Sequence, residues 1–434
     1  MGQGLAGLLG SMLKVGTIGF GGGAALIPVM EKELVDRGTL DERTFGTHTL
    51  IANITPGALP VKLAALAGAE GNGWLGSVLA ALAVALPGTF ATVGLLAGFN
   101  AIGPGAIRFV EFAAVGIAAF IIVLLAMFIA KVLRAGGRRF RIYVLVVLAS
   151  FLATGANQLV AVVGRLFGQE WQAAIPQLNA LQLILATLVV IGVSTMVRRT
   201  GPAPVAGGPA PFKSSTAAWW AGGAFSVLVA VVLVASFAIG GAGFLGLVGL
   251  STVTSFGGGE AYVGVADGFF VASGIVPGNE FYGQAVPVAN ALPGPILVKI
   301  ASALGYSYGL QAGGWQLGLV FALAAFLLSV SACCAVAMLL MGGYGKVANS
   351  AFVRRLGAYV LPVICGLLIT TCLSMILANM DIAGHAGINQ PAVGWATLIG
   401  ALALWALHKR FHLHDVVLLL IAGSVSLVGM LLAS

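Results

Sequence analysis

Two lysines, Lys62 and Lys299, lie at matching places in a repeated motif, each within an otherwise apolar stretch. A lysine at the centre of a bilayer costs roughly 2.5–3.5 kcal/mol on insertion scales, so it normally faces a cavity or a partner. Two ammonium groups that meet could together hold a doubly charged oxyanion. The alternatives are an ion pair with a carboxylate, for which Glu31, Glu260 and Asp267 are candidates, and snorkelling to the membrane interface.

The motif that contains the lysines reads N-x-x-P-G-x4-K-x5-G. Between residues 52–68 and 289–305, eight of the seventeen positions are identical without a gap. Shared Asn, Pro and Lys in one register are rare by chance between apolar segments, so the match indicates an internal duplication. The motif residues are Asn53, Pro56, Gly57, Lys62 and Gly68 in the first copy, and Asn290, Pro293, Gly294, Lys299 and Gly305 in the second.

A second motif, Phe-Gly-Gly-Gly, precedes each copy of the first. Its residues are Phe20, Gly21, Gly22 and Gly23, and again Phe256, Gly257, Gly258 and Gly259. Glycine triplets and Pro-Gly pairs both interrupt helices and expose backbone groups, which lipid tolerates only where the break is buried in protein or lines a cavity. Paired breaks in two halves point to a transport site. The alternative is that the glycines only permit close helix packing.

Two acidic residues are candidates for coupling to an ion. Glu260 follows the second glycine triplet, where the first half has Ala24, and it could relay a proton with a lysine or serve as a structural partner of Lys299. Glu31 belongs to a mixed-charge segment that reads more simply as a solvated face. His48 has a weaker claim to proton transfer.

The composition is that of a membrane protein. Of 434 residues, 59% are hydrophobic and only 8% are charged, whereas soluble domains carry about a quarter charged residues. Long apolar stretches approach the roughly 20 residues that cross a bilayer as a helix. We therefore predict an all-α polytopic fold with broken or re-entrant helices and about 10–13 membrane segments. No metal-ligand set or cofactor motif is recognised, so we predict neither metal nor cofactor.

The sequence divides into two halves and a link between them. Residues 198–218 are rich in Pro and Gly and carry Arg198, Arg199 and Lys213, which predicts a linker outside the membrane. An apolar segment at 219–239 predicts a connecting transmembrane helix. We therefore expect an N-terminal transporter repeat at 1–197 and a C-terminal inverted repeat at 240–434.

The loop charges predict that the halves are inverted. The segment 131–141 holds five basic residues, while its counterpart 381–390 has no Lys or Arg; in the next loop the basic cluster belongs to the second half, at His408, Lys409 and Arg410. Loops rich in Lys and Arg stay cytoplasmic, so corresponding loops lie on opposite sides. The net charge of +8 thus reflects membrane orientation, and we expect no nucleic-acid partner.

The two motifs resemble those of the chromate transporter family. The resemblance runs from Gly19 to Gly23 through Pro28 and Glu31 to Asn53, Pro56 and Gly57, and again from Phe256 to Gly259 and at Asn290, Pro293, Gly294 and Pro295. It implies a two-domain, multi-pass protein of the bacterial inner membrane that moves chromate. The first half departs from the family's Pro-Gly-Pro, with Ala58 in third place, and the family commonly has uncharged residues where Lys62 and Lys299 stand.

Taken together, these features predict a secondary transporter, not an enzyme, that moves a small oxyanion such as chromate or sulfate by alternating access. We expect the four broken segments to bind the anion, with Asn53 and Asn290 orienting the loops, and a proton or other ion to drive transport. The alternatives are a carrier of an organic dicarboxylate, a passive anion channel, and a cation carrier that uses Glu260. The lipid bilayer is the expected surrounding, and the sequence leaves a homodimer open.

Overall fold

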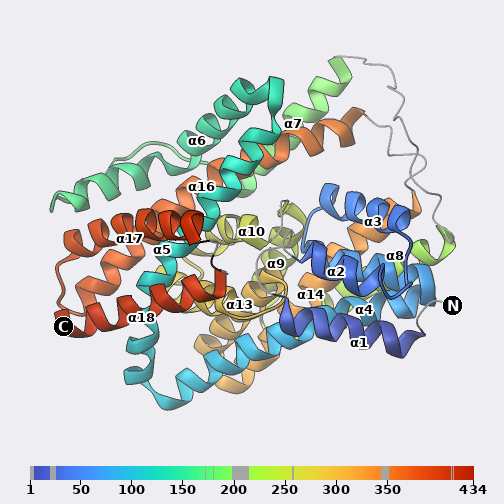
Figure 1. Ribbon diagram of the computed structural model, residues 1–434, viewed down its shortest axis with the longest axis horizontal. Helices are drawn as coiled ribbons and strands as arrows, with labels where there is room; N and C mark the ends of the chain where they lie inside the picture. The colour runs from blue at the N-terminus through green and yellow to red at the C-terminus, as the bar shows by residue number, and fades with distance from the viewer. Residues whose placement is uncertain are drawn as a thin grey trace. The chain divides into compact units, whose positions relative to one another are not determined.

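The computed structural model describes residues 4–19, 26–171, 173–178, 180–197, 215–256, 259–343, 351–411, 413 and 415–434. Within these ranges every regular element is a helix (Figure 1), which confirms the predicted all-α class. The helices are α1 (Leu5–Ile18), α2 (Ile27–Leu34), α3 (Glu42–Ile54), α4 (Leu59–Ile102), α5 (Pro104–Ala135), η1 (Gly137–Arg139), α6 (Phe140–Leu166), α7 (Ala180–Val197), α8 (Ser215–Ala238), α9 (Ala242–Thr254), α10 (Gly259–Ala266), η2 (Asp267–Val271), α11 (Gly278–Glu280), η3 (Phe281–Ala285), α12 (Val286–Ala291), α13 (Ile296–Gly313), α14 (Trp315–Gly342), α16 (Ala351–His385), α17 (Gln390–Phe411) and α18 (Asp415–Ala433).

Many of these helices are long and apolar enough to cross a membrane. Among the described residues, seven helices are long and apolar enough to cross a bilayer, and five further apolar helices are shorter. The protein is therefore a multi-pass membrane protein, as predicted. Which of the shorter helices cross fully and which are re-entrant stays a prediction.

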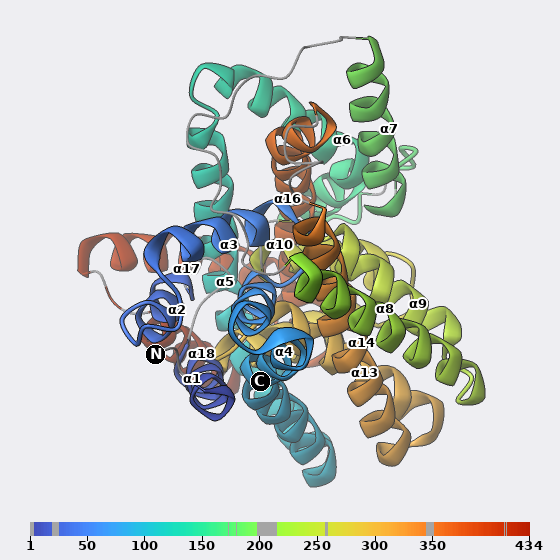
Figure 2. The same ribbon diagram turned by 90° about the vertical axis from the view of Figure 1, so that its right-hand side faces the viewer.

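Both predicted repeats have a helix that is interrupted at a glycine. Helix α4 is broken at Asn72 and Gly73, and Gly73 has φ of 66°. Gly314, with φ of 89°, separates α13 from α14. Glycine is the residue that adopts these left-handed angles readily, and a tryptophan follows it in both places, Trp74 and Trp315. The helical segments on either side of each glycine pack closely: a Cβ atom added to Gly68 would lie 2.3 Å from the carbonyl oxygen of Gly76, and Figure 2 shows α13 beside α14.

The chain forms two compact units, and each combines segments from both halves of the sequence. The first contains Met1–Val93, Leu185–Tyr262 and Leu292–Val360; the second contains Gly94–Ile184, Val263–Ala291 and Leu361–Ser434. The predicted division into residues 1–197 and 240–434 describes a sequence repeat, and it stays a prediction. Most of the predicted linker lies outside the described residues, and α8 occupies the place of the predicted connecting helix.

Small residues let the helices of each unit approach closely. In the first unit, a Cβ atom added to Gly305 would lie 2.5 Å from the carbonyl oxygen of Phe321. In the second unit, a Cβ atom on Gly116 would lie 2.0 Å from the carbonyl oxygen of Ala422, and α5, α17 and α18 share an apolar core around Phe120. Such contacts are typical of helix packing in membranes, where close backbone approach replaces the hydrophobic effect.

Candidate functional site

Both motif lysines are fully buried in the first unit, at equivalent positions of two helices. Lys62 is the fourth residue of α4, and Lys299 is the fourth residue of α13. Neither side chain is exposed to solvent. Each ammonium group donates a hydrogen bond to the carbonyl oxygen seven residues earlier, Lys62 to Thr55 at 2.5 Å and Lys299 to Leu292 at 2.5 Å. Each side chain therefore folds back over the break that precedes its own helix.

Of the two alternative roles considered for the lysines, snorkelling does not fit their burial, and an ion pair with Glu260 stays a prediction. No ion pair among the described residues includes Lys62 or Lys299. Snorkelling would leave the ammonium group at the surface, but both are sealed inside the protein. Of the candidate partners, Glu31 is exposed on α2, and the side chain of Glu260 lies outside the described residues.

The breaks before the lysines have the same backbone geometry in both repeats. Gly57 has φ of 98° and Gly294 has φ of 97°, both in the left-handed region that favours glycine. Pro293 and Pro56 precede these glycines, and Pro295 caps α13 at its N-terminus. The Pro-Gly pair thus ends one helix, and the helix that carries the lysine begins at once.

Reciprocal backbone hydrogen bonds join the two repeats at these breaks. The Gly57 N–H donates to the carbonyl oxygen of Ser255 at 2.6 Å, and the Gly294 N–H donates to the carbonyl oxygen of Gly19 at 2.8 Å. Ser255 and Gly19 each precede the phenylalanine of a Phe-Gly-Gly-Gly motif. The Pro-Gly break of each half is therefore bonded to the start of the glycine motif of the other half.

Much of the Phe-Gly-Gly-Gly motif itself is not described by the structure. Phe20, Gly21, Gly22, Gly23, Gly257 and Gly258 lie outside the described residues. Phe256 is buried, and Gly259 begins α10, where an added Cβ atom would lie 2.6 Å from Cβ of Ile296. The described end of the second motif thus lies against the first turn of α13.

The two motif asparagines bond to their own helices. Asn53 donates to the carbonyl oxygen of Thr49 at 2.8 Å, and Asn290 donates to that of Val286 at 2.8 Å. Both bonds span four residues, in the last turn before each break. A role in orienting the loops stays a prediction.

Two small residues that the sequence did not single out, Cys333 and Gly88, pack directly against the breaks. A Cβ atom on Gly57 would lie 2.1 Å from Cβ of Cys333 on α14, and one on Gly88 of α4 would lie 2.1 Å from the carbonyl oxygen of Pro293. The Gly88 site also borders Cδ of Lys299, at 3.1 Å. Each break is thus covered by a small residue of a long helix, and neither residue belongs to a motif.

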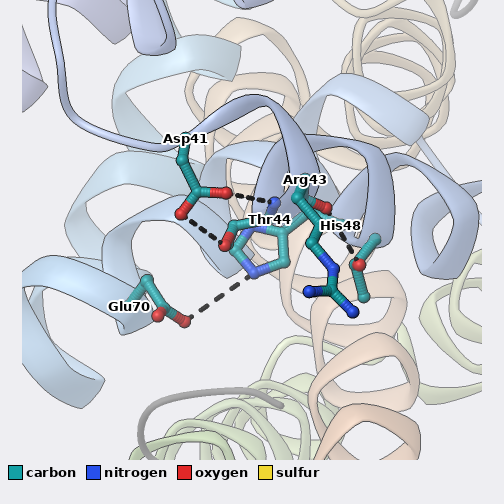
Figure 3. Close-up of polar contacts among 6 residues, drawn as sticks. Asp41, Arg43, Thr44, His48 and Glu70 are labelled. Atoms are coloured by element: carbon teal, nitrogen blue, oxygen red, sulfur yellow. Dashed lines mark hydrogen bonds and ion pairs between the residues drawn. The ribbon is translucent and has the colours of Figure 1, made fainter. Parts of the chain in front are cut away.

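A buried histidine and a buried carboxylate meet elsewhere in the first unit. His48 of α3 has no exposed side-chain surface, and its Nε2 lies 3.9 Å from Oε2 of Glu70 on α4 (Figure 3). Burial lowers the pKa of His48 to about 4, and the nearby Asp41 carboxylate opposes this shift. Asp41 also caps α3, because its Oδ1 accepts the Thr44 N–H at 2.8 Å. Sequence reasoning singled out His48 but not Glu70.

The acidic segment around α2 contains a structural ion pair. Glu33 is buried and binds Lys14 at 2.5 Å and Arg37 at 3.0 Å, while Glu31 points to solvent. A coupling role for Glu31 or Glu260 has no test in this geometry and stays a prediction.

Comparison with known proteins identifies one family for both repeats. Residues 6–169 and 244–427 both match the model of the chromate transporter family. The transporters YwrB and YwrA of Bacillus subtilis, both described as uncharacterized, are 40% identical over 98 residues and 38% identical over 80 residues. These alignments cover 22% and 18% of this chain, and 50% and 45% of the relatives.

A probable chromate transport protein of Synechococcus elongatus is 37% identical over 84 residues, which is 19% of this chain and 21% of that protein. The chain thus spans half or less of the length of these curated relatives. No solved structure matches the chain. Because the family model covers both repeats and most of the sequence, the chain belongs to the chromate transporter family.

Proposed function

We propose that this protein is a secondary transporter of a small, doubly charged oxyanion. The observation that carries the proposal is the pair of equivalent, fully buried ammonium groups, Lys62 and Lys299. A buried charge is costly unless an opposite charge or several hydrogen bonds compensate it. Among the described residues each ammonium group makes one hydrogen bond and no ion pair, so we propose that a bound anion compensates the buried charge.

The backbone around each lysine adds to this preference for an anion. An ammonium group has three donors, and one of them is used by the carbonyl oxygen behind it. Helices α4 and α13 begin three residues before Lys62 and Lys299. The N-terminal turn of a helix presents unpaired N–H groups and partial positive charge, which favour anions.

Two lysines at equivalent positions favour a dianion, and chromate and sulfate both carry this charge. Two ammonium groups balance two negative charges, and tetrahedral oxygens accept hydrogen bonds from several directions. The similarity to the probable chromate transport protein of Synechococcus elongatus supports chromate. Charge and geometry alone do not separate chromate from sulfate, so we propose the class of small tetrahedral dianions.

Burial of both lysines supports transport by alternating access. Both ammonium groups are closed off from solvent, so an anion reaches them only after the breaks separate. The reciprocal bonds from Gly57 to Ser255 and from Gly294 to Gly19 are matching contacts between repeats, which supports an inverted-repeat carrier that opens to one side at a time. We place it in a bacterial inner membrane.

Uptake of radiolabelled chromate into proteoliposomes tests the proposal. We expect saturable uptake that sulfate inhibits and dicarboxylates do not, and we expect the double variant Lys62→Met/Lys299→Met to lose it. The variant Lys131→Met, which changes an exposed lysine, is the control and should transport like the wild type. Equal flux in the wild type and the double variant would contradict the binding role. Inhibition by dicarboxylates alone would indicate the organic-anion carrier, and single-channel currents would indicate a channel.

A further inference from the structure

The second unit contains a series of polar side chains that runs from an exposed histidine to a buried carboxyl group. It lies around two π-helices, η2 (Asp267–Val271) and η3 (Phe281–Ala285). π-helices are rare and are found frequently at functional sites. Neither this series nor the π-helices belong to the lysine site of the first unit.

Asp267 and Tyr282 form the buried end of the series. Asp267 is 6% exposed and Tyr282 is 1% exposed. The Tyr282 hydroxyl faces the Asp267 carboxyl group and the Ser374 side chain on α16. A buried tyrosine hydroxyl usually interacts with a polar partner, and here one of the two groups that it faces is a buried carboxyl group.

Glu111 and His385 form the outer end. Glu111 of α5 is partly buried and interacts with the side-chain amide of Gln284 and, through charge, with His385. His385 is exposed and is the last residue of α16. A Cβ atom on Gly283 would lie 3.4 Å from Cγ of Glu111, so η3 packs directly against this carboxyl-bearing side chain.

Helix η3 links the two ends, because it carries a partner of each acid. Tyr282 faces Asp267, and Gln284, two residues later, faces Glu111. Three further ionisable residues lie on the elements around η3: Cys372, beside Tyr282; Arg108, whose guanidinium lies 5.2 Å from the centre of the Phe112 ring; and Glu280, which directly precedes η3. Among the described residues, no Lys or Arg forms an ion pair with either acid.

We propose that these residues form a proton-coupling site, with Asp267 as the group that binds the transported proton. Asp, Glu and His residues inside membrane segments are typical of proton relays in transporters. The Asp267 carboxylate binds a proton to give a neutral carboxylic acid and releases it when the acid ionises again, while Glu111 and His385 extend the polar series toward the exposed end of α16. No other bond changes. The inference rests on the proposed anion transport, and it places coupling in the second unit and anion binding in the first.

Two transport assays on the same proteoliposomes separate these claims. The first measures chromate exchange with equal pH on both sides, which needs the anion site but no net proton movement. The second measures chromate accumulation driven by an imposed pH gradient. For Asp267→Asn we expect accumulation to fall at least about tenfold while exchange stays within about twofold of the wild type. The control Glu170→Gln changes an exposed acid of the same unit and should behave like the wild type in both assays.

Several results of these two assays would overturn the proposal. Accumulation by Asp267→Asn equal to that of the wild type would overturn the proposal, and so would wild-type exchange without any response to the pH gradient. If Asp267→Asn does not fold, Tyr282→Phe takes its place: it removes the facing hydroxyl and should lower accumulation several-fold more than exchange. Equal loss of both activities in a folded Tyr282→Phe protein would also overturn it. Absence of exchange in the wild type would instead contradict the proposed function.

Discussion

At the residue scale, the burial of Lys62 and Lys299 lowers the stability of the folded protein. Both are fully buried, whereas Lys32 and Lys131 are exposed. Removing an ammonium group from water without a counter-ion destabilises the folded state by several kcal/mol. A protein that retains two such groups at equivalent positions does so at the expense of stability, which is a common property of binding sites.

This cost gives a prediction for each single variant. Lys62→Met and Lys299→Met keep most of the side-chain length and remove the buried charge, so we expect each to raise the free energy of unfolding by about 1–3 kcal/mol when no anion is present. Thermal unfolding in detergent measures the change, and the exposed Lys131→Met should shift it by less than about 0.5 kcal/mol. A drop in stability for both buried variants would show that the lysines are structural.

At the element scale, the Pro-Gly breaks depend on backbone geometry that only glycine tolerates. Gly57→Ala should lower the free energy of unfolding by about 2–5 kcal/mol, because it adds strain at φ of 98° and an overlap with Cys333. The control Gly38→Ala has φ of 71° and open space around the new methyl group, so about 1 kcal/mol is expected. Denaturation of the two variants under identical conditions gives the comparison.

The overlap can be tested apart from the strain. Adding Cys333→Gly to Gly57→Ala removes the side chain that the new methyl group meets, so it should restore part of the lost stability. No recovery in the double variant would show that the close approach of α14 to the break is not as described.

A second prediction at this scale concerns the helix that covers the other break. Gly88→Ala places a methyl group 2.1 Å from the Pro293 carbonyl oxygen and beside Lys299. It should therefore displace the Pro293–Gly294 break from α4 and slow chromate transport by at least about tenfold. Gly94→Ala on the same helix meets no atom within 4 Å and should leave transport unchanged. Initial uptake rates in proteoliposomes measure both, and equal rates would contradict the predicted role of Gly88.

The sequence predicted these elements only in part, for physical reasons. Lysines and Pro-Gly pairs inside membrane segments cost free energy, so their repetition predicts a functional site from the sequence alone. The bonds from Gly57 to Ser255 and from Gly294 to Gly19 involve backbone groups, which every residue has and no motif marks. Asp267 and Tyr282 become neighbours through two π-helices, and side-chain spacing alone does not predict a π-helix.

At the scale of the whole molecule, each compact unit combines both sequence halves, so the halves cannot be expected to fold as separate bodies. The sequence predicts a repeat at residues 1–197 and 240–434, which stays a prediction, and it does not predict this interleaving, because a hydrophobic pattern marks helices and not their neighbours. A chain cut within residues 198–214 should therefore need both fragments together to give a stable protein. Co-purification of the two fragments measures this, and a stable, monodisperse N-terminal fragment on its own would contradict it.

Stability of the whole molecule should depend on pH through His48. Its pKa of about 4 in the folded protein lies below the ordinary value of 6.5, so the unfolded chain binds the proton more tightly. The contribution of neutral His48 is complete above about pH 6.5 and is lost as the pH falls toward 4, by about 3 kcal/mol in total. Thermal unfolding between pH 5 and 7.5 should show this loss in the wild type and a flatter profile in His48→Gln. Identical profiles would contradict the burial of His48.

The central claim is that Lys62 and Lys299 together bind an anion, and equilibrium binding of radiolabelled chromate to the purified protein tests it most directly. We expect saturable binding of one anion per chain, competition by sulfate, and loss of affinity by at least about a hundredfold in Lys62→Met/Lys299→Met. Lys32→Met/Lys131→Met should bind like the wild type. Equal chromate affinity in the wild type and in the variant without the two buried lysines would contradict the account.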